Sequence, residues 1–399
     1  MTECCASDSP STSTYDIAVI GAGSAGFSAA ITAAEAGASV ALIGHGTIGG
    51  TCVNVGCVPS KTMIRATESI HQAQAAKRFS GIEASANILD WKAVNNQKNE
   101  LVTSLRQAKY ADLLPSYDKI AYIEGVAQLE DGGVFVDGAL IRANKVIVAT
   151  GASPVPPTID GMDSVPYLTS TEALDFKTLP KSLLIIGGGY IGCELAQMLG
   201  RAGVDVTIVC RSRLLPEAEP EISKALTEYF REEGIRVLDG LSYQRIRETS
   251  DGVILDVTTE GEPQSISAEQ VLVTTGRKAN TVGLRLESVG VELLPNGGIK
   301  VDDRMRTTRS GIYAAGDVTG TDQFVYMAAY GAKLAAKNAM NSDSMVYDNS
   351  AMPWVVFTDP QVAGVGLSEA AAKDKDFDVK TSTLSLEHVP RALAARDTR

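Results

Sequence analysis

Short apolar runs alternate with amphipathic stretches along most of this chain. The run YDIAVI at 15–20 leads into a glycine-rich turn, an alanine-rich amphipathic stretch at 27–36 and a second apolar run, SVALIG at 39–44. Runs of this length are typical of buried strands, and the 3.6-residue period between them is typical of a helix. The order strand, turn, helix, strand predicts a parallel α/β unit at the start of the chain.

The same order returns in the middle of the chain, where SLLIIG at 182–187 precedes a glycine turn, a helix ending near Arg201 and the strand VDVTIVC at 204–210. Two such units predict two parallel α/β domains. From Met352 the composition changes, and PWVVFTDPQVAGVGLS reads as a strand that opens a third domain. Further helices are predicted at 61–77, 90–114 and 324–338, and further strands at 120–129, 134–136, 145–154, 271–280 and 311–315.

Each glycine turn has the spacing G-x-G-x-x-G within a strand–turn–helix context. In the first turn, Gly21 permits the tight turn, Gly23 allows a pyrophosphate to approach the backbone, and Gly26 allows close packing of helix and strand. The second turn repeats the pattern at Gly187, Gly189 and Gly192. The alternative reading is a glycine-rich surface turn, but the flanking elements favour two dinucleotide sites, with each helix N-terminus facing phosphate.

The residues after the second strand of each unit differ from the usual pattern. An acidic residue that binds ribose commonly ends this strand. The first unit has Gly44 and His45 there, so another group must bind the ribose. The second has Arg211 and Arg213, which suit a 2′-phosphate and favour NADPH over NADH, unless they are only surface charges. Asp317, in GIYAAGD, can bind a ribityl hydroxyl.

Composition narrows the class of protein. A chain of 399 residues with 44% hydrophobic and 21% charged residues is typical of a multidomain soluble protein. The net charge of −12 argues against nucleic acid or an anionic membrane as a partner. No apolar run reaches the ~20 residues of a membrane span. Residues 1–14 read as a flexible polar tail without signal-peptide features, so a cytoplasmic location is expected.

Cysteine is scarce, with six residues, and two lie in the segment GGTCVNVGCVPSK at 49–61. Cys52 and Cys57 are close enough to form a small disulfide or to bind one soft metal ion together. A pair of buried packing cysteines is the plainer alternative. Cys4 and Cys5 could also share a soft metal or be incidental thiols, and Cys193 and Cys210 are interpreted as packing residues.

These motifs together resemble the flavoprotein disulfide reductases, a family with an FAD domain, an inserted NAD(P)H domain and a C-terminal dimerisation domain. The resemblance implies a tail at 1–14, an FAD domain at 15–152 and 279–348, an NADPH domain at 153–278 and an incomplete dimerisation domain at 349–399. Within the family the chain is most similar to the mercuric reductases, in the segments GTIGGTCVNVGCVPSK, RQAKY, YLTSTEAL, DQFVYMAA, AMPWVVFTDPQVAGVG and VPRALAARDTR.

The resemblance implies a homodimeric enzyme that reduces Hg(II), delivered as a thiol complex, to Hg(0) at Cys52 and Cys57. By the same resemblance, Cys57 is expected to face the flavin and Cys52 to exchange with incoming ligands. The resemblance also implies that Lys61 lies beside flavin N5 and pairs with Glu194, that Tyr110 lies near the metal, and that Tyr190 covers the nicotinamide pocket. The implied FAD residues are Gly21, Gly23, Ser24, Ala25, Gly26, Gly46, Thr51, Lys61, Ala127, Asp317 and Val325, and the NADPH residues are Gly187, Gly189, Tyr190, Gly192, Arg211, Arg213 and Gly276.

Two departures from that group leave alternatives open. The metal-trapping domain that often precedes the enzyme is absent, and the vicinal cysteines near the family's C-terminus are expected beyond Arg399, so the chain reads as a fragment. An NAD(P)H-dependent reductase of an organic disulfide, or a dihydrolipoamide dehydrogenase, is the alternative enzyme. A protein that binds Hg(II) without turnover is the alternative from another class.

Overall fold

The computed structural model describes residues 14–341 and 343–399, so the expected N-terminal tail, with Cys4 and Cys5, lies outside the described residues except for Thr14. The chain divides into two compact units, which are considered separately below. Unit 1 comprises Met1–Cys52, Leu105–Ser153 and Lys278–Asp348, and unit 2 comprises Val53–Ser104, Pro154–Arg277 and Asn349–Arg399.

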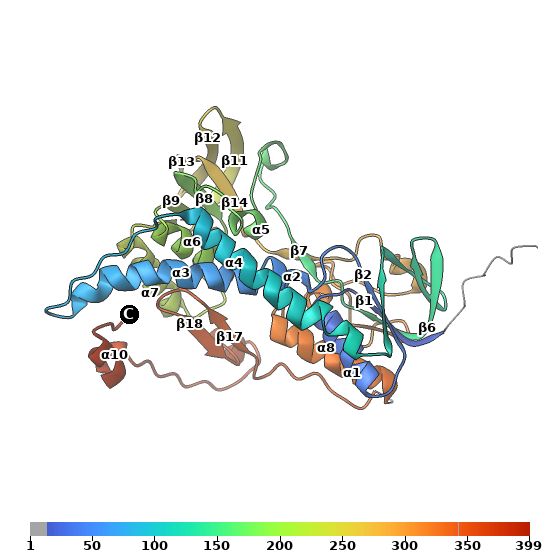
Figure 1. The fold of residues 1–399 in the computed structure, drawn as a ribbon. Coiled ribbons are helices and arrows are strands. Elements are labelled where there is room, and N and C mark those ends of the chain that lie inside the picture. Colours follow the sequence, from blue (N-terminus) through green and yellow to red (C-terminus); the bar gives the residue numbers. More distant parts are fainter. Residues whose placement is uncertain (1–13, 342) are drawn as a thin grey trace, which may run out of the picture. The chain divides into compact units, whose positions relative to one another are not determined.

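Unit 1 is built on one mixed sheet (Figure 1). Its parallel strands are β1 (Tyr15–Ile20), β2 (Val40–Gly44), β3 (Ile120–Glu124), β6 (Ala139–Val148) and β16 (Ile312–Ala314). Antiparallel β5 (Gly133–Val136) and β4 (Ala127–Glu130) extend it from β6 in the order β3-β2-β1-β6-β5-β4. The predicted strand 120–129 is therefore two strands, because the chain turns at Gly125, whose φ is +155°.

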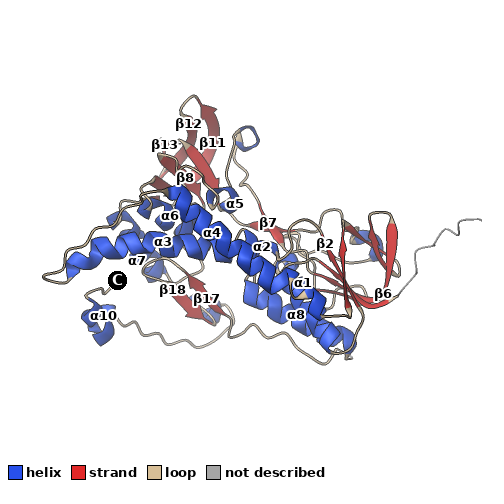
Figure 2. Cartoon of the chain, in the orientation of Figure 1, coloured by secondary structure: helices blue, strands red, loops and turns tan. Residues whose placement is uncertain are grey.

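Two helices of unit 1, α1 (Ser24–Glu35) and α8 (Val325–Met340), lie side by side against the sheet (Figure 2). Both bury alanines, such as Ala30 and Ala335, so their backbones approach closely. The unit also contains a π-helix (Gln107–Ala111) and 3₁₀ turns at Leu114–Ser116, Glu287–Val289 and Asp317–Thr319. The helix predicted to Leu114 thus ends earlier, in a wider π turn.

Unit 2 contains a parallel four-stranded sheet in the order β10-β9-β8-β14. Its strands are β8 (Ser182–Ile186), β9 (Asp205–Val209), β10 (Arg236–Leu238) and β14 (Gln270–Val273), with helices α5 (Ser170–Ala173), α6 (Tyr190–Arg201) and α7 (Pro220–Glu232) and a 3₁₀ turn at Met162–Ser164. An antiparallel sheet is formed by β11 (Ser242–Thr249), β12 (Gly252–Thr259) and β13 (Glu262–Ala268). Ile185, Leu199 and Phe230 are fully buried in the core.

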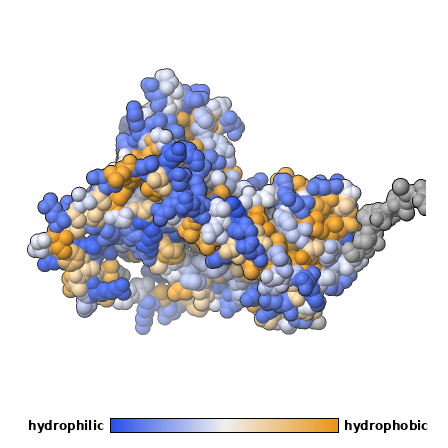
Figure 3. Space-filling model, viewed as in Figure 1, coloured by the Kyte–Doolittle hydropathy of each residue, from blue (hydrophilic) through white to orange (hydrophobic). Residues whose placement is uncertain are grey.

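The helices α3 (Cys57–Ala75) and α4 (Trp91–Arg106) belong to unit 2 as far as Ser104, with a 3₁₀ turn at Ala76–Arg78 after α3. Met63 and Ile64 of α3 pack into the same core as α6, which explains why this segment groups with the second nucleotide unit rather than with the first, where the sequence placed it. The helix begins at Cys57, four residues before its predicted start. A band of hydrophilic side chains covers the outer face of α4 (Figure 3).

The chain crosses between the units at β7 (Ala152–Pro154) and β15 (Arg277–Ala279), and these two strands pair with each other. The domain boundaries predicted at 152 and 278 fall within these strands. The C-terminal segment contains the hairpin β17 (Pro353–Val356) and β18 (Val362–Val365) where one strand was predicted, because residues 357–361 form a turn. It also contains α9 (Glu369–Lys373), a 3₁₀ turn at Leu386–His388 and α10 (Pro390–Ala395). In the described part of the chain, every helix is too short or too polar to span a bilayer.

Candidate redox and nucleotide sites

The first glycine loop adopts the conformation that its sequence predicted. Gly21 has φ +117°, and a Cβ added at Gly26 would lie 1.7 Å from the Gly21 carbonyl oxygen. The segment that carries Cys52 rests on this loop, because a Cβ at Gly50 would lie 2.7 Å from the Cα of Gly23. Only glycine fits at these contacts, and the backbone is left bare where a pyrophosphate would lie.

The helix α1 begins directly after this loop, and no side chain caps the backbone N–H groups of its first turn. Its first residue, Ser24, lies with its hydroxyl 3.2 Å from that of Tyr110. The Tyr110 ring meets Phe27 edge-on, with the ring centroids 4.9 Å apart. Tyr110 sits in the π-helix, so the residue predicted to lie near mercury is placed at the first nucleotide loop.

Asp317 lies close to this loop as well. The preceding Gly316 has φ +78°, and a Cβ there would lie 3.1 Å from the Cβ atoms of both Ala25 and Ala328. The backbone before Asp317 thus packs between α1 and α8, and Asp317 is the first residue of a 3₁₀ turn. The other predicted FAD residues in unit 1 are Gly46 (φ +74°) and Thr51, both exposed, Ala127, buried in β4, and Val325, the first residue of α8.

The structure explains why the first unit lacks an acidic ribose anchor. A Cβ at Gly44 would lie 2.7 Å from the Tyr122 hydroxyl and 2.7 Å from the Cβ of Ala22. A carboxylate side chain therefore has no room there, and the phenol of Tyr122 lies at its place. Burial, with the nearby Glu124 carboxylate, raises the pKa of Tyr122, so its hydroxyl remains a neutral donor and acceptor. Sequence analysis missed this residue.

Cys52 and Cys57 lie in two successive helices. Cys52 lies in α2 (Gly50–Asn54), and Cys57 is the first residue of α3, with both side chains half-buried. The α3 helix is 19 residues long and no side chain caps its N-terminus, so the positive end of its dipole lies at Cys57. This environment favours the thiolate form of Cys57.

Lys61 and Glu194 form an ion pair, as the sequence predicted. The Lys61 Nζ lies 2.7 Å from Glu194 Oε2, and the Glu194 side chain is 7% exposed. The backbone N–H of Phe357 donates to Glu194 Oε1 at 3.0 Å, and Lys61 Nζ lies 4.8 Å from the centre of the Phe357 ring. Phe357, which sequence analysis did not single out, thus contacts both charged groups and satisfies the buried carboxylate.

Tyr190 is the first residue of α6, directly after the second glycine loop. Its ring stacks on that of Trp354, with the centroids 5.9 Å apart and the planes 23° from parallel. Trp354 lies in β17, so one short segment supports both Tyr190 and the Lys61–Glu194 pair. Trp354 was also missed, because nothing in the local sequence pattern indicates a contact across 164 residues.

The second glycine loop repeats the first. Gly187 has φ +119°, and a Cβ at Gly192 would lie 2.1 Å from the Gly187 carbonyl oxygen. Open space surrounds Gly189 and Gly276, where an added Cβ would meet nothing within 4 Å. The α6 N-terminus has no side-chain cap. These features fit the pyrophosphate of a second dinucleotide.

The two arginines after β9 have different surroundings. Arg211 is exposed, with its guanidinium carbon 5.4 Å from the centre of the Tyr243 ring. Arg213 instead donates through one terminal nitrogen to the carbonyl oxygens of Pro216 and Ala218, both at 2.9 Å. Arg211 is therefore available to a 2′-phosphate, whereas Arg213 stabilises its own loop.

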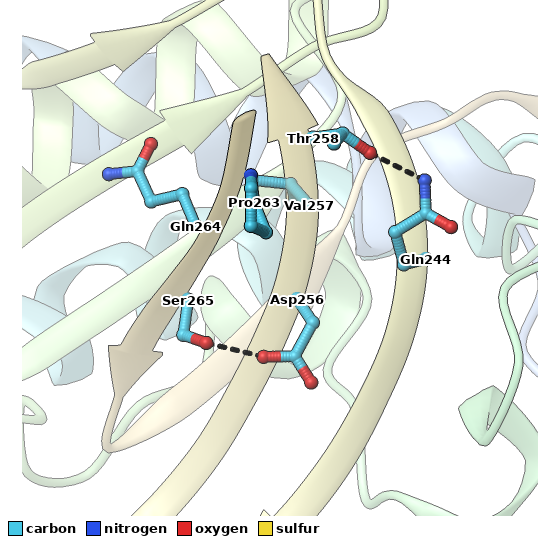
Figure 4. Close-up of a pocket in the computed structure, with 7 residues that line it drawn as sticks. All are labelled: Gln244, Asp256, Val257, Thr258, Pro263, Gln264 and Ser265. Atoms are coloured by element: carbon cyan, nitrogen blue, oxygen red, sulfur yellow. Dashed lines mark hydrogen bonds between the residues drawn. The ribbon is translucent and has the colours of Figure 1, made fainter. Parts of the chain in front are cut away.

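A hollow on the antiparallel sheet of unit 2 is lined by residues of β11, β12 and β13 (Figure 4). Its polar side chains pair with each other, Ser265 with Asp256 at 2.6 Å and Gln244 with Thr258 at 2.6 Å. Its lining contains none of the residues discussed above. We assign it no function.

Both loops fit the cofactors that the sequence predicted, and the chain belongs to the pyridine nucleotide-disulphide oxidoreductase family. The family model matches residues 15–336, and that of the family's dimerisation domain matches residues 352–399. Membership confirms the predicted fold class, two dinucleotide-binding α/β domains with a dimerisation domain, and the expected FAD and NADPH.

Within this family the chain is similar to mercuric reductases, as the sequence motifs predicted. It is 46% identical over 386 residues to the mercuric reductase of Bacillus cereus, covering 96% of this chain and 61% of that protein. It is 45% identical to those of Staphylococcus aureus and Streptomyces lividans, covering 96% of this chain in each case and 70% and 82% of those proteins. The chain thus spans roughly three-fifths to four-fifths of these relatives.

Solved structures show the same fold. The HOCl-induced flavoprotein disulfide reductase RclA from Escherichia coli superposes with a TM-score of 0.82 at 31% identity, covering 96% of this chain and 85% of that one. A Cu(II) complex of the same protein gives a TM-score of 0.82 at 30% identity, covering 97% and 85%.

Proposed function

We propose that the protein to which this chain belongs reduces Hg(II) to Hg(0) with NADPH, through FAD and the pair Cys52 and Cys57. The observation that carries the proposal is the dithiol segment held on the first nucleotide loop, together with the 46% identity to a mercuric reductase. When bound, FAD would accept a hydride equivalent from NADPH and supply the electron pair that reduces the disulfide of Cys52 and Cys57, or the Hg(II) bound by the two thiolates.

The two cysteines bind the metal as thiolates. Hg(II) is a soft ion, and two thiolates match its preference for soft ligands in a linear arrangement. Binding forms two bonds from the cysteine sulfurs to Hg(II) and breaks the two Hg–S bonds of the incoming thiol complex, whose two thiols leave with any protons that the cysteines carried. Two electrons from NADPH then cleave both S–Hg bonds, which returns the two thiolates and releases neutral Hg(0). Cys52, half-buried in α2, exchanges with incoming thiol complexes of Hg(II), whereas Cys57, at the α3 N-terminus, is the thiolate next to the flavin.

The Lys61–Glu194 pair holds a positive charge in place beside the dithiol helix. Lys61 lies one turn after Cys57 on α3, so its ammonium group favours negative charge near the start of that helix. Glu194 fixes the Lys61 side chain, and Phe357 fixes Glu194. The pair therefore positions the Lys61 ammonium group.

Three aromatic or charged residues complete the proposal. Tyr190, at the start of α6, covers the nicotinamide pocket, and Tyr110 offers its hydroxyl near the first loop. Arg211 binds the 2′-phosphate of NADPH beside Tyr243. The dimerisation domain at 352–399 supports a homodimer, and Hg(II) arrives as a thiol complex.

The first test is Hg-dependent oxidation of NADPH by the full protein in excess thiol. We expect rapid oxidation with the wild type and a loss of at least about 10³-fold in Cys52→Ala and in Cys57→Ala, since each removes a ligand that the reaction needs. Cys5→Ala, which leaves Cys52, Cys57 and the two buried cysteines intact, is the control for loss of any cysteine. Oxidation that survives in both dithiol variants contradicts the proposal.

The second test separates the two sulfurs. Reduction of the enzyme should produce a long-wavelength charge-transfer absorbance that Cys57→Ala abolishes and Cys52→Ala retains. The reverse pattern would show that Cys52 is the thiolate next to the flavin.

A further inference from the structure

Two buried cysteines lie on either side of the second nucleotide loop, and the proposed reaction uses neither of them. Cys193 lies in the first turn of α6 and is 0% exposed, and Cys210 follows β9 and is 5% exposed. The Cys193 Sγ lies 3.5 Å from the carbonyl oxygen of Gly188. A Cβ added at Gly188 would lie 3.2 Å from the Cys210 Sγ. Both sulfurs therefore contact one loop residue.

Their surroundings are apolar. Both cysteines belong to one buried cluster that includes Ile185, Ile208 and Leu214. Burial raises the pKa of the Cys210 thiol to about 12, and burial, followed by the proximity of Cys210, raises that of Cys193 as well. At neutral pH the two groups are therefore protonated thiols with low reactivity toward ordinary electrophiles, but a metal with high affinity for sulfur can displace their protons.

The two thiols of Cys193 and Cys210 determine which metal ion could bind between them. Among residues 14–341 and 343–399, no group of three or more His, Cys, Asp or Glu side chains could hold a metal ion. A tetrahedral ion such as Zn²⁺ thus lacks the ligands it needs around Cys193 and Cys210. Two thiols without further ligands suit a soft ion that accepts linear coordination, which is the property of Hg(II).

We propose that Cys193 and Cys210 form a second, inhibitory Hg(II) site beneath the NADPH loop. Binding forms two S–Hg bonds and releases two protons, and no electron is transferred. Gly188 lies near both sulfurs, and its carbonyl oxygen accepts a 2.7 Å hydrogen bond from the backbone N–H of Leu215. Drawing both sulfurs onto one ion displaces Gly188 and this contact, and with them the loop that receives the pyrophosphate.

The first nucleotide loop has no equivalent pair of thiols through which Hg(II) could displace it. The position equivalent to Cys193 is Phe27, and that equivalent to Cys210 is Gly44. The corresponding space in unit 1 is filled by aromatic rings rather than by thiols. Excess Hg(II) should therefore block NADPH while FAD stays bound. The second site does not depend on Cys52 or Cys57, so it can be tested without turnover.

The test uses the full chain with Cys4, Cys5, Cys52 and Cys57 all replaced by Ala, so that only Cys193 and Cys210 remain of its six cysteines. HgCl2 is added, and singly bound metal is stripped with a competing monothiol before gel filtration. We expect about one Hg(II) to remain per chain, with ultraviolet thiolate-to-mercury absorbance. Adding Cys193→Ser or Cys210→Ser should each reduce the retained metal to near zero. No retained Hg(II) in the parent, or unchanged retention in both Ser variants, overturns the site.

A second measurement tests inhibition and guards against misfolding of the variants. With the same parent, saturating NADPH should slow Hg(II) uptake at least about tenfold, and one equivalent of bound Hg(II) should abolish the fluorescence change on NADPH binding without release of FAD. Uptake that NADPH does not slow, or Hg(II)-loaded protein that still binds NADPH, overturns the inhibitory role. Turnover at Cys52 and Cys57 is absent from both experiments, so their outcome is separate from that of the proposed reaction.

Discussion

The two glycine loops share one backbone and differ in what surrounds it. Gly21 and Gly187 have φ values of +117° and +119°, and each loop leads into a helix of 12 residues without a side-chain cap. Ser24 opens the first helix beside Tyr110, whereas Tyr190 opens the second beside Trp354. The backbone therefore provides a generic pyrophosphate site, and the neighbouring side chains determine which nucleotide binds and how tightly it is enclosed.

The ends of the second strands show this most directly. In the first unit Gly44 leaves room only for the Tyr122 hydroxyl, whereas in the second unit Cys210 is followed by the exposed Arg211. A neutral phenol suits ribose hydroxyls, and a guanidinium suits a phosphate. We therefore propose that the two loops distinguish FAD from NADPH through residues that lie just outside the shared motif.

The largest effects are expected from the third glycine of each loop. Gly26→Ala and Gly192→Ala would each place a Cβ against a carbonyl oxygen, at 1.7 Å and 2.1 Å. We expect Gly26→Ala to be purified without FAD, and Gly192→Ala to keep FAD while its KM for NADPH rises at least about 100-fold, or ~2.7 kcal/mol. Flavin absorbance and steady-state kinetics measure the two effects.

A matched control is Gly189→Ala, because its Cβ would meet nothing within 4 Å and its φ is −79°. This variant should keep the melting temperature of the wild type and weaken only nucleotide binding. If Gly26→Ala retained FAD while Gly192→Ala lost it, the assignment of the two loops would be reversed.

The second prediction separates the two arginines. Arg211→Gln should raise the KM for NADPH roughly 10- to 100-fold and leave that for NADH almost unchanged, since a hydrogen bond to a charged group contributes ~1.5–3 kcal/mol. Arg213→Gln should instead lower the melting temperature by a few degrees with little change in cofactor preference, because Arg213 binds Pro216 and Ala218. Equal effects of the two variants on NADPH preference would show that Arg213 also contacts the phosphate.

The third prediction concerns the ring stacked on Tyr190. Trp354→Ala should raise the KM for NADPH about 2- to 10-fold at unchanged kcat, which corresponds to the ~0.5–1.5 kcal/mol of an aromatic pair. Trp354→Phe should restore most of the affinity. In a Tyr190→Ala background, Trp354→Ala should have almost no effect, and a full additive effect there would show that Trp354 acts elsewhere.

The smallest effect is expected at Tyr122. Tyr122→Phe should weaken FAD binding about 2- to 5-fold, the contribution of one neutral hydrogen bond of ~0.5–1 kcal/mol. Titration of the apoprotein with FAD measures it. Tyr117→Phe, which removes only the exposed contact to Glu35 at 3.4 Å, is the control and should bind FAD as the wild type does.

Local sequence patterns predicted the features that depend on residues close together in the chain. The strands and glycine turns at 15–26 and 182–192, the cysteine segment and the pairing of Lys61 with Glu194 could all be anticipated, the last from family resemblance. Phe357 and Trp354 could not, because their contacts depend on a hairpin far along the chain. The contact of Tyr122 with Gly44 could not be predicted either, because it depends on the pairing of β3 with β2. The π-helix that contains Tyr110 could not be predicted, because no periodic pattern of apolar residues marks it in the sequence.

The Lys61–Glu194–Phe357 contact also has a consequence for biosynthesis. Glu194 lies 133 residues after Lys61, and Phe357 a further 163 residues after Glu194. At about 5–20 residues per second, a ribosome needs roughly 15–60 s to travel from Lys61 to Phe357. During that time a nascent chain displays both thiols of the redox segment before its charged neighbours are fixed. These two thiols are therefore accessible to thiol-binding metals before the charged neighbours of Cys57 are in place.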